Sequence, residues 1–452
     1  MDMNTQDTAP SSDVKHHLHP MGDATELRRD GSSIAEKAAG ATLTVDGRVY
    51  IDGLSGLACV NIGYGNETVC DAASRAMRCL SYAHSFGTQS NRDAALLASK
   101  LFELTDGRFD KFFFGTSGSD AIESAIKIAY YYWRRSGEPG RRVILSREHS
   151  YHGNTIVATS LTGIGHYHEQ FGLPLRGMVR HISTPYWYRY GRGRSPEEVG
   201  AAAAASLEHA IIDVGPENIA AFIGEPIQVT GGVIIPPANY WPEIQRICSK
   251  YDVLFIADEV VTGFGKVGTM FAYQRFGFVP DILVLAKGLT SGYYPMSSVG
   301  IDRKVTEVFD DAAEEFVHGF TYCAHPVGAA VALANIGVIE GEGLVQRVKG
   351  EVERRLAAGL VGLSRHRIVG DVRSMGVLGA VEFEADDGSE AGRTRICDAV
   401  IKAVRSQGVI ARAVGGTLVL ALPMIITDAQ IDEVIRALDA GIVEVMNSLS
   451  VR

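Results

Sequence analysis

The stretch DILVLAKGLTSG, residues 281–292, carries the pattern on which the fold prediction rests. Its apolar run, residues 282–286, leads directly into Lys287, and Gly288 then breaks the pattern. A short continuous apolar run predicts a strand buried on both faces, as in a parallel sheet. Lysine is rarely buried without a partner. Lys287 therefore either ends the strand in water, which is the ordinary outcome, or has a function at the carboxyl end of the strand.

Similar apolar runs recur along the chain and alternate with helical patterns such as YWPEIQRICSKY (240–251). Strand–helix alternation predicts an α/β fold with a mostly parallel sheet covered by helices on both sides. Besides DILVLAK, the predicted strands are KFFFG (111–115), RRVILS (141–146), IAAFIGEP (219–226), VLFIADEV (253–260) and SSVGI (297–301).

The sequence pattern changes after about residue 335. Long amphipathic helical patterns, such as residues 343–363, mix there with short alternating strands such as GAVEFEA (379–385). We predict a second, smaller α+β domain, and we expect YIDGLSG (50–56) to pair with it. The predicted divisions are 1–74 for an N-terminal tail and a segment of the small domain, 75–330 for the large domain and 331–452 for the C-terminal small domain.

Composition restricts the class of protein. The net charge of −10 disfavours nucleic acid or an anionic membrane surface as the main partner. No apolar run reaches transmembrane length, and the first residues lack a secretory signal pattern. The six cysteines show no metal-ligand spacing, so reduced thiols and a cytoplasmic setting are expected. We also expect no metal site, because the histidine cluster at His16, His17 and His19 has no obvious carboxylate or thiol companion.

Three ionisable residues follow predicted strands. Glu225 ends the apolar run AFIG, Asp258 ends LFIA and Lys287 ends ILVLA. Ligands of open parallel sheets bind beyond the carboxyl ends of the strands. We therefore expect the three side chains to converge on one crevice.

A further motif predicts a phosphate site. Residues 112–133 run from a strand through a Gly/Ser/Thr turn into a helix, and Ser117 with Asp120 has the spacing of a capping box. Backbone N–H groups and the dipole at such a helix N-terminus attract phosphate. An ordinary capped helix would give the same pattern. After the next strand, HSYHGNT (149–155) offers an aromatic side chain, Tyr151, that could stack on a planar ring or simply pack at the surface.

A lysine, an aspartate, a phosphate cradle and a stacking aromatic together suit pyridoxal 5′-phosphate. The lysine amine can form a Schiff base with its aldehyde, and a carboxylate can keep the pyridine nitrogen protonated so that the ring accepts electrons. Asp258 is the candidate carboxylate, and Val260 can cover the ring face opposite Tyr151.

At this point the chain resembles the class III, or ω-amino-acid, pyridoxal-phosphate aminotransferases of fold type I, in particular the branch with putrescine–pyruvate and amine–pyruvate transaminases. The resemblance runs from about residue 16 to 445. The matching motifs are HHLHP, NIGYG, GTSGSDAIESAIK, YHGNT, GEPIQ, FIADEVVTGFG, LAKGLTSGYYP, HGFTYCAHP and ARAVGG.

The resemblance implies roles for individual residues around the cofactor. Gly118 and Ser119 match the phosphate-binding turn, and Tyr151 matches the ring-stacking aromatic. Asp258 matches the partner of the pyridine nitrogen, with Val260 behind the ring. These assignments follow from the family motifs rather than from residue spacing.

Other matching positions concern catalysis and the partner subunit. Lys287 matches the Schiff-base lysine, and Glu225 a residue near the ring. Thr321, in HGFTY, matches a residue that reaches the phosphate of the neighbouring subunit's cofactor, so a homodimer with shared active sites is implied. Arg412, in ARAVGG, matches a mobile arginine that binds a substrate carboxylate, a role that suits a guanidinium.

The implied reaction is a ping-pong transamination. An amine gives its amino group to the cofactor, and a keto acid such as pyruvate or 2-oxoglutarate then accepts it. Freed Lys287, with a pKa lowered by burial and nearby cations, would move the proton.

The chain departs from the branch in its expected substrate pocket. Ala58, in GLACVN, stands where relatives have tryptophan, Thr230 occupies a wall position, and the stretch from Tyr82 to Ser90 is less apolar than usual. We predict a wider, more polar pocket for a bulky polar amine such as an amino sugar or polyamine. Alternatively, neighbouring side chains fill the space. Lys266 stands where arginine is common, with no evident consequence.

Three alternative functions remain to be compared. Epimerisation or elimination on the same scaffold would also need Lys287 and Asp258, although Arg412 favours a reaction with a keto acid. A catalytically silent binding protein would be free to lose one of these residues. A nicotinamide dehydrogenase is disfavoured because GxGxxG does not follow an early strand.

Overall fold

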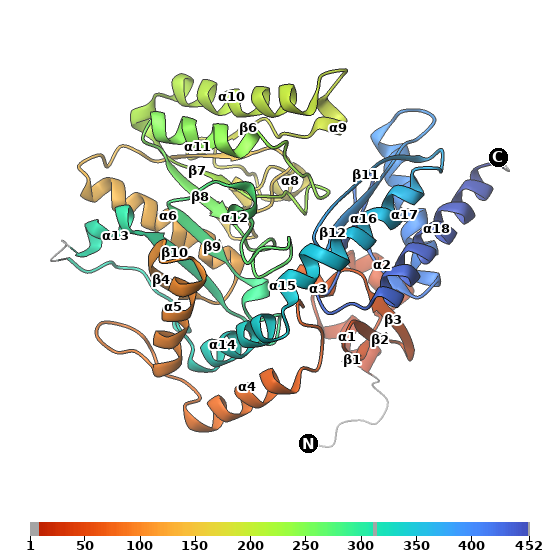
Figure 1. Cartoon of the computed structure of the whole chain (residues 1–452), viewed down its shortest axis with the longest axis horizontal. Helices are drawn as coiled ribbons and strands as arrows, with labels where there is room; N and C mark the ends of the chain where they lie inside the picture. Colours follow the sequence, from red (N-terminus) through yellow and green to blue (C-terminus); the bar gives the residue numbers. More distant parts are fainter. Residues whose placement is uncertain (1–8, 311–313, 451–452) are drawn as a thin grey trace.

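A seven-stranded sheet forms the centre of the larger part of the molecule (Figure 1). The computed structural model describes residues 9–310 and 314–450. The strand order is β4-β10-β9-β8-β7-β5-β6. The strands are β4 (Phe109–Gly115), β5 (Val143–Arg147), β6 (Val179–Ile182), β7 (Ile219–Gly224), β8 (Leu254–Asp258), β9 (Ile282–Leu285) and β10 (Ser297–Asp302).

The predicted mostly parallel sheet is confirmed, and two of its details were not predicted. Strands β6, β5, β7, β8 and β9 pair in parallel, whereas β10 runs antiparallel to both β4 and β9. The sequence run SSVGI does not reveal its direction, because a buried strand reads the same either way. Edge strand β6 was not predicted, because its four residues, VRHI, place two basic side chains between two apolar ones and form too short a pattern.

Helices cover both faces of this sheet because its side chains alternate between two apolar layers. One face, with Ile223, Ile256 and Val284, packs on α6, and the other, with Phe222 and Phe255, packs on α11. The helices of this part are α4 (Glu67–Cys79), α5 (Arg92–Leu104), α6 (Gly118–Arg135), α7 (Ile156–Leu161), α8 (His166–Glu169), α9 (Trp187–Tyr190), α10 (Pro196–Val214), α11 (Tyr240–Lys250), α12 (Ala272–Phe276), α13 (Arg303–Asp310) and α14 (Pro326–Gly341), with 3-10 turns η1 (Pro216–Asn218) and η2 (Lys287–Leu289).

The N- and C-terminal segments together form the smaller part, on the right of Figure 1. Strand β3 pairs in parallel with β13, which confirms the expected pairing of residues 50–56 with the C-terminal region. One sheet has the order β1-β2-β3-β13 and a second has the order β11-β12-β15-β14. The strands of these two sheets are β1 (Ala35–Ala39), β2 (Thr42–Val45), β3 (Arg48–Asp52), β11 (Val369–Met375), β12 (Leu378–Phe383), β13 (Val409–Ile410), β14 (Arg412–Val414) and β15 (Thr417–Ala421).

The long helical pattern over residues 343–363 is not one regular helix. It is divided into α15 (Leu344–Arg347), a π-helical turn η3 (Val348–Val352) and α16 (Glu353–Leu363). Val348 and Val352 are both fully buried, so the wider turn keeps two apolar side chains in the core around Gly350, a residue that weakens regular helix. The remaining helices are α1 (Ala9–His16), α2 (Ala24–Asp30), α3 (Ser55–Ala58), α17 (Glu390–Ser406) and α18 (Asp428–Ser450).

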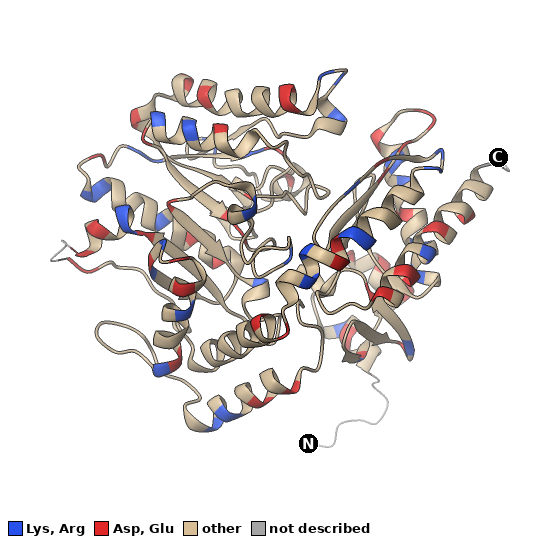
Figure 2. Ribbon diagram, viewed as in Figure 1, with Lys and Arg blue, Asp and Glu red and all other residues tan. Residues whose placement is uncertain are grey.

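Charged residues of both signs are interspersed along the outer helices, and the strands of the large sheet are mostly uncharged (Figure 2). Within residues 9–310 and 314–450, no single helix is both long and apolar enough to cross a membrane, although the bent pair Pro326–Gly341 and Leu344–Leu363 passes that test of length and composition when taken together.

Trp241 on α11 links this helix to the sheet behind the strand ends. Its ring stacks on Phe278 at 4.7 Å and on Phe255 at 5.7 Å between centroids. The Arg147 guanidinium lies 4.9 Å from the ring centroid, and Nε1 donates a hydrogen bond to Pro226 O at 3.2 Å. The side chain is 1% exposed, so it contributes both apolar burial and a satisfied polar contact.

We expect Trp241→Ala to lower the free energy of unfolding by about 3–5 kcal/mol, because it leaves a large cavity between α11 and the sheet. Urea unfolding followed by circular dichroism measures this loss. The matched control is Trp187→Ala, since Trp187 is 44% exposed, and it should cost much less. Equal losses for the two variants would contradict this account of the core.

Candidate active site

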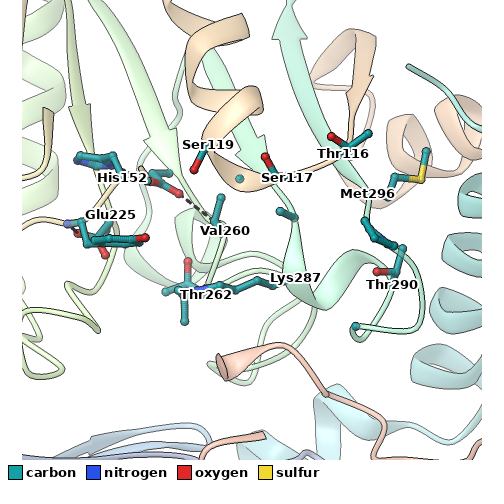
Figure 3. Close-up of a pocket in the computed structure, with 18 of the residues that line it drawn as sticks. Thr116, Ser117, Ser119, His152, Glu225, Val260, Thr262, Lys287, Thr290 and Met296 are labelled. Carbon is teal, nitrogen blue, oxygen red and sulfur yellow. Dashed lines mark hydrogen bonds and ion pairs between the residues drawn. The ribbon is translucent and has the colours of Figure 1, made fainter. Parts of the chain in front are cut away.

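Three neighbouring strands of the large sheet deliver ionisable side chains to one cavity (Figure 3). Glu225 directly follows β7, Asp258 is the last residue of β8, and Lys287 begins the turn η2 after β9. All three line a cavity of about 300 Å³. The convergence expected from the sequence is therefore present, and it results from the parallel pairing of β7, β8 and β9.

The N-terminus of α6 closes one side of this cavity. Ser117 is the N-cap, and its hydroxyl and the Asp120 carboxylate form the predicted capping box. Gly118 and Ser119 follow in the first turn and line the cavity. A Cβ on Gly118 would lie 3.1 Å from Val260 Cγ1, so the glycine keeps this approach open. The free N–H groups of the first helical turn suit an anion here.

Lys287 extends across the cavity below Val260, toward Thr262 (Figure 3). Among the described residues, no hydrogen bond partner is found for its Nζ. Burial lowers the pKa of Lys287 from its usual value, whereas Cys59, Asp258 and Glu225 act in the opposite direction. An amine in this setting loses its proton more readily than a surface lysine, which suits a nucleophile or a base.

Asp258 is held by a residue that the sequence analysis missed, His152. His152 Nδ1 lies 2.7 Å from Asp258 Oδ2, and the other carboxylate oxygen accepts a hydrogen bond from Val260 N at 3.0 Å. Both side chains are buried, and His152 Nε2 has no hydrogen bond partner among the residues that the structure describes. The only sequence hint was the position of His152 next to Tyr151, after a predicted strand.

Glu225 lies close enough to Asp258 for the two carboxyl groups to interact electrostatically. Burial, and then the nearby Asp258 carboxylate, raise the pKa of Glu225 to about 8. Its Oε1 accepts a hydrogen bond from Tyr151 N at 3.0 Å, and Arg147 donates to its backbone oxygen. Because a protonated Glu225 carries no charge, Asp258 is the carboxylate suited to hold a cation at this end of the cavity.

The predicted substrate residues surround two further cavities that continue from the first. A cavity of about 410 Å³ shares Tyr151, Val261 and Lys287 with it and is also lined by Ala58, Thr230 and Arg412. An outer cavity of about 690 Å³ shares Tyr167, Thr230 and Arg412 with the second and adds polar side chains that include His149, Glu390 and Arg393. Ala58, Thr230 and Arg412 thus lie together near Lys287.

Tyr82 and Thr321 lie elsewhere. The Tyr82 hydroxyl donates a hydrogen bond to Thr321 O at 2.8 Å, and its ring meets Tyr322 edge-on at 6.2 Å between centroids. Tyr82 and Thr321 are exposed and line none of the three cavities described above. The structure therefore does not bring them to the substrate cavity of their own chain.

The histidine cluster near the N-terminus does have a carboxylate companion, contrary to the premise of the sequence analysis. Asp13 Oδ1 lies 2.9 Å from His17 Nδ1, and Asp13 Oδ2 lies 2.7 Å from His19 Nε2. The three groups could hold a metal ion by proximity. Asp13 lies in α1, four residues before His17, so the two side chains lie on the same side of the chain. These hydrogen bonds already account for the arrangement, with the pKa of Asp13 lowered to about 2, chiefly by His17.

Comparisons with known proteins identify relatives over nearly the whole chain. Residues 28–442 match the family model for class-III aminotransferases. The putrescine–pyruvate aminotransferase of Pseudomonas aeruginosa is 41% identical over 426 residues, covering 93% of this chain and 92% of that protein.

Solved structures give the same result. The omega transaminase of Pseudomonas jessenii in complex with PMP superimposes with a TM-score of 0.95 at 35% identity, covering 98% of this chain and 99% of that one. An engineered thermostable omega transaminase, a tryptophan-to-glycine variant for asymmetric synthesis of enantiopure bulky amines, also has a TM-score of 0.95 at 35% identity, with 97% and 99% covered.

The raised pKa of Glu225 predicts a pH-dependent stability. The folded protein retains this proton between the ordinary glutamate pKa of 4.5 and about 8, so the contribution of Glu225 to stability falls as the pH rises through this window. Glu225→Gln should therefore gain stability relative to the wild type by a few kcal/mol between pH 5 and pH 9.

Thermal unfolding across this pH range measures the difference. The control is Glu217→Gln, an exposed glutamate shortly before the same strand. It should leave the pH dependence unchanged. A constant difference between Glu225→Gln and the wild type at all pH values would show that Glu225 is ionised throughout.

Proposed function

The chain belongs to the class III aminotransferases, which use pyridoxal 5′-phosphate and transfer an amino group between an amine and a keto acid, and on this premise we propose that Lys287 and Asp258 are its catalytic residues and that its amine substrate is bulky and polar. The observation that carries the proposal is the desolvated Lys287 amine in a cavity that also holds the Asp258–His152 pair and the N-terminus of α6.

The residues around the first cavity fit the cofactor. The first turn of α6, with Gly118 and Ser119, would bind the phosphate. Tyr151 and Val260 would cover the two faces of the ring. Asp258 would hold the protonated ring nitrogen. Bound there, the cofactor supplies an aldehyde that reacts with amines and a ring that withdraws electrons from the adjacent carbon.

Lys287 has two tasks in the proposed reaction. Its amine would hold the cofactor covalently through the aldehyde, and as a free amine its Nζ would take a proton from the α-carbon of the substrate and return it. The lowered pKa of Lys287 supports the second task, because a neutral amine is needed to accept a proton. An amine gives up its amino group in one half-reaction, and pyruvate or 2-oxoglutarate receives it in the other.

His152 and Glu225 support Asp258. The 2.7 Å contact from His152 fixes the orientation of the Asp258 carboxylate, and Val260 N fixes its second oxygen. The raised pKa of Glu225 favours its neutral form, which would add no second negative charge beside Asp258. This arrangement favours one cation at the Asp258 carboxylate, which is the state in which the ring accepts electrons.

A homodimer is part of the proposal. Thr321, Tyr322 and Tyr82 form an exposed cluster outside the cavities of their own chain, which supports a role in completing the partner's site. A cytoplasmic setting is also proposed, supported by free cysteines throughout the described chain. The domain divisions at residues 74 and 330 remain predictions, and no metal, nucleic acid or membrane partner is proposed.

The widened substrate pocket rests on Ala58 and Thr230. Ala58 lines the second cavity close to Lys287, and Thr230 stands where the second cavity opens into the polar outer one. A neighbouring structure with tryptophan replaced by glycine was engineered for bulky amines, which supports the idea that a small residue widens such a site. Arg412 lines both cavities and has no ion pair among the described residues, so it is available for a keto-acid carboxylate.

Lys287→Ala should abolish turnover, because the chain then lacks the amine that binds the cofactor and moves the proton. Turnover of 1-phenylethylamine and pyruvate, followed by acetophenone formation, measures this. Lys250→Ala, which removes a surface ion pair with Glu208, should retain wild-type activity. Near-normal turnover in Lys287→Ala would refute the assignment.

Ala58→Trp should narrow the second cavity and restrict the substrate range. We expect kcat/KM for an aminoglycoside to fall by at least about tenfold, a loss of about 1.4 kcal/mol in transition-state stabilisation, with a much smaller change for a small alkyl amine. The ratio of kcat/KM for the aminoglycoside to kcat/KM for the small alkyl amine, measured in one preparation, is the control, because loss of active enzyme would lower both values equally. An unchanged ratio would mean that Ala58 does not set the pocket width.

A further inference from the structure

Lys266 is a second buried lysine that the proposed mechanism does not use. It lies in the turn between β8 and α12, with 0% of its residue surface exposed. The only hydrogen bond of its Nζ to a described residue reaches Ser55 Oγ at the long distance of 3.4 Å. A buried ammonium with one weak neutral partner is costly, so the fold retains an unfavourable group at this position.

The backbone prevents Lys266 from moving outward. Its carbonyl accepts a hydrogen bond from Val377 N at 2.9 Å, and Asn61 Nδ2 donates to Phe264 O two residues earlier at 2.9 Å. A Cβ on Gly376 would lie 2.0 Å from Lys266 O, so the strand region packs directly on the turn. The side chain is therefore held facing the segment that contains Ser55.

The neighbouring carboxylate, Asp52, is already fully engaged. Its oxygens accept hydrogen bonds from Leu54 N, Gly56 N and the Tyr64 hydroxyl at 2.6–3.0 Å. It does not form an ion pair with Lys266. Both Asp52 and Lys266 thus support the same segment, the first through its backbone and the second through Ser55.

That segment is a wall of the substrate cavity. Leu54, Leu57 and Ala58 line the cavity, and Ser55 and Ala58 have positive φ angles of 46° and 58°. Non-glycine residues in this conformation are strained and persist only where surrounding contacts fix them. Lys266 supplies one of those contacts from behind.

Burial lowers the pKa of Lys266 to about 7, with Cys59 and Asp52 acting to raise it and Lys287 to lower it further. On the outer side of the turn, Arg275 donates to Val267 O and is paired with Glu353. Lys266 therefore loses its proton more readily than a surface lysine, and it lies within electrostatic reach of Lys287. A charged Lys266 would oppose both the protonation of Lys287 and the entry of a cationic amine.

We propose that Lys266 is a positioning residue for substrate recognition, holding the wall of residues 54–58 through Ser55 and placing its amino group behind the substrate cavity. The kinetic consequence rests on the function proposed above. The amine substrate should bind less tightly when Lys266 is charged, and the wall should be less well placed when Lys266 or the Ser55 hydroxyl is removed.

The first test compares KM and kcat of the holoenzyme from pH 6 to pH 9. Lys266→Met should raise KM for the amine by about threefold or more at pH 8 and flatten its pH dependence, with kcat changed by less than about twofold. Lys266→Arg keeps a charged side chain next to Ser55 at every pH in this range. Its KM for the amine should therefore be independent of pH and close to the KM of the wild type at pH 6, where Lys266 is charged. Ser55→Ala should raise KM but retain the pH dependence.

Lys349→Met is the matched control, because Lys349 packs against the same turn at Gly268 from the exposed side. It should behave as the wild type. A wild-type KM profile in Lys266→Met would overturn the proposal, and so would a wild-type KM in Ser55→Ala, which also serves if Lys266→Met does not fold.

The second test does not require activity. Between pH 7 and the ordinary lysine pKa of 10.5, the unfolded chain binds a proton that folded Lys266 does not, so this residue makes stability rise with pH. Thermal unfolding of Lys266→Met should show a shallower rise than the wild type and Lys349→Met. If stability rises with pH as steeply in Lys266→Met as in the wild type, Lys266 does not titrate in this range, whatever reaction the enzyme catalyses. If the wild type shows no transaminase turnover, only the proposed function is refuted.

Discussion

The parallel pairing of β7, β8 and β9 is the constraint on which the site depends. Gly224 pairs with Ala257, and Asp258 pairs with Val284, so the three strands end at one edge of the sheet. The residues that follow or close these strands, Glu225, Asp258 and Lys287, must then face the same cavity. The helix α6 follows β4 at the same edge, and the backbone N–H groups of its N-terminus suit an anion there.

Burial gives these ionisable groups their chemical character. The same desolvation lowers the pKa of Lys287 and raises that of Glu225, so an amine that can be neutral stands near a carboxyl that can be protonated. Asp258 differs because His152 and Val260 N both contact its carboxylate. Such a set of buried polar groups costs stability, and the large apolar layers on both faces of the sheet offset that cost.

The cavity proposed for the substrate is built differently from the cavity proposed for the cofactor. Its walls come from segments far apart in the chain, with Ala58 from the N-terminal region, Thr230 from the loop after β7 and Arg412 from β14. The wall of residues 54–58 is strained and is supported from behind by Asp52 and Lys266. In the proposed function, the catalytic residues and the residues that select the substrate thus come from different parts of the fold. Substrate selectivity can therefore change while the catalytic residues stay the same.

Local patterns in the sequence were enough to predict several features of the fold and of the site. Apolar runs that end in Glu225, Asp258 and Lys287 predicted the strands and their common edge, and the Ser117–Asp120 spacing predicted the capped helix, because burial and capping act over a few residues. The family motifs added the cofactor. Contacts between residues far apart in the chain could be identified only from the folded structure. His152 contacts Asp258 across 106 positions of sequence, and Lys266 contacts Ser55 across 211. The structure also shows that Tyr82 lies away from the proposed substrate cavity and that β10 runs antiparallel to β9. Such contacts depend on the packing of whole elements, and no short pattern of residues records that packing.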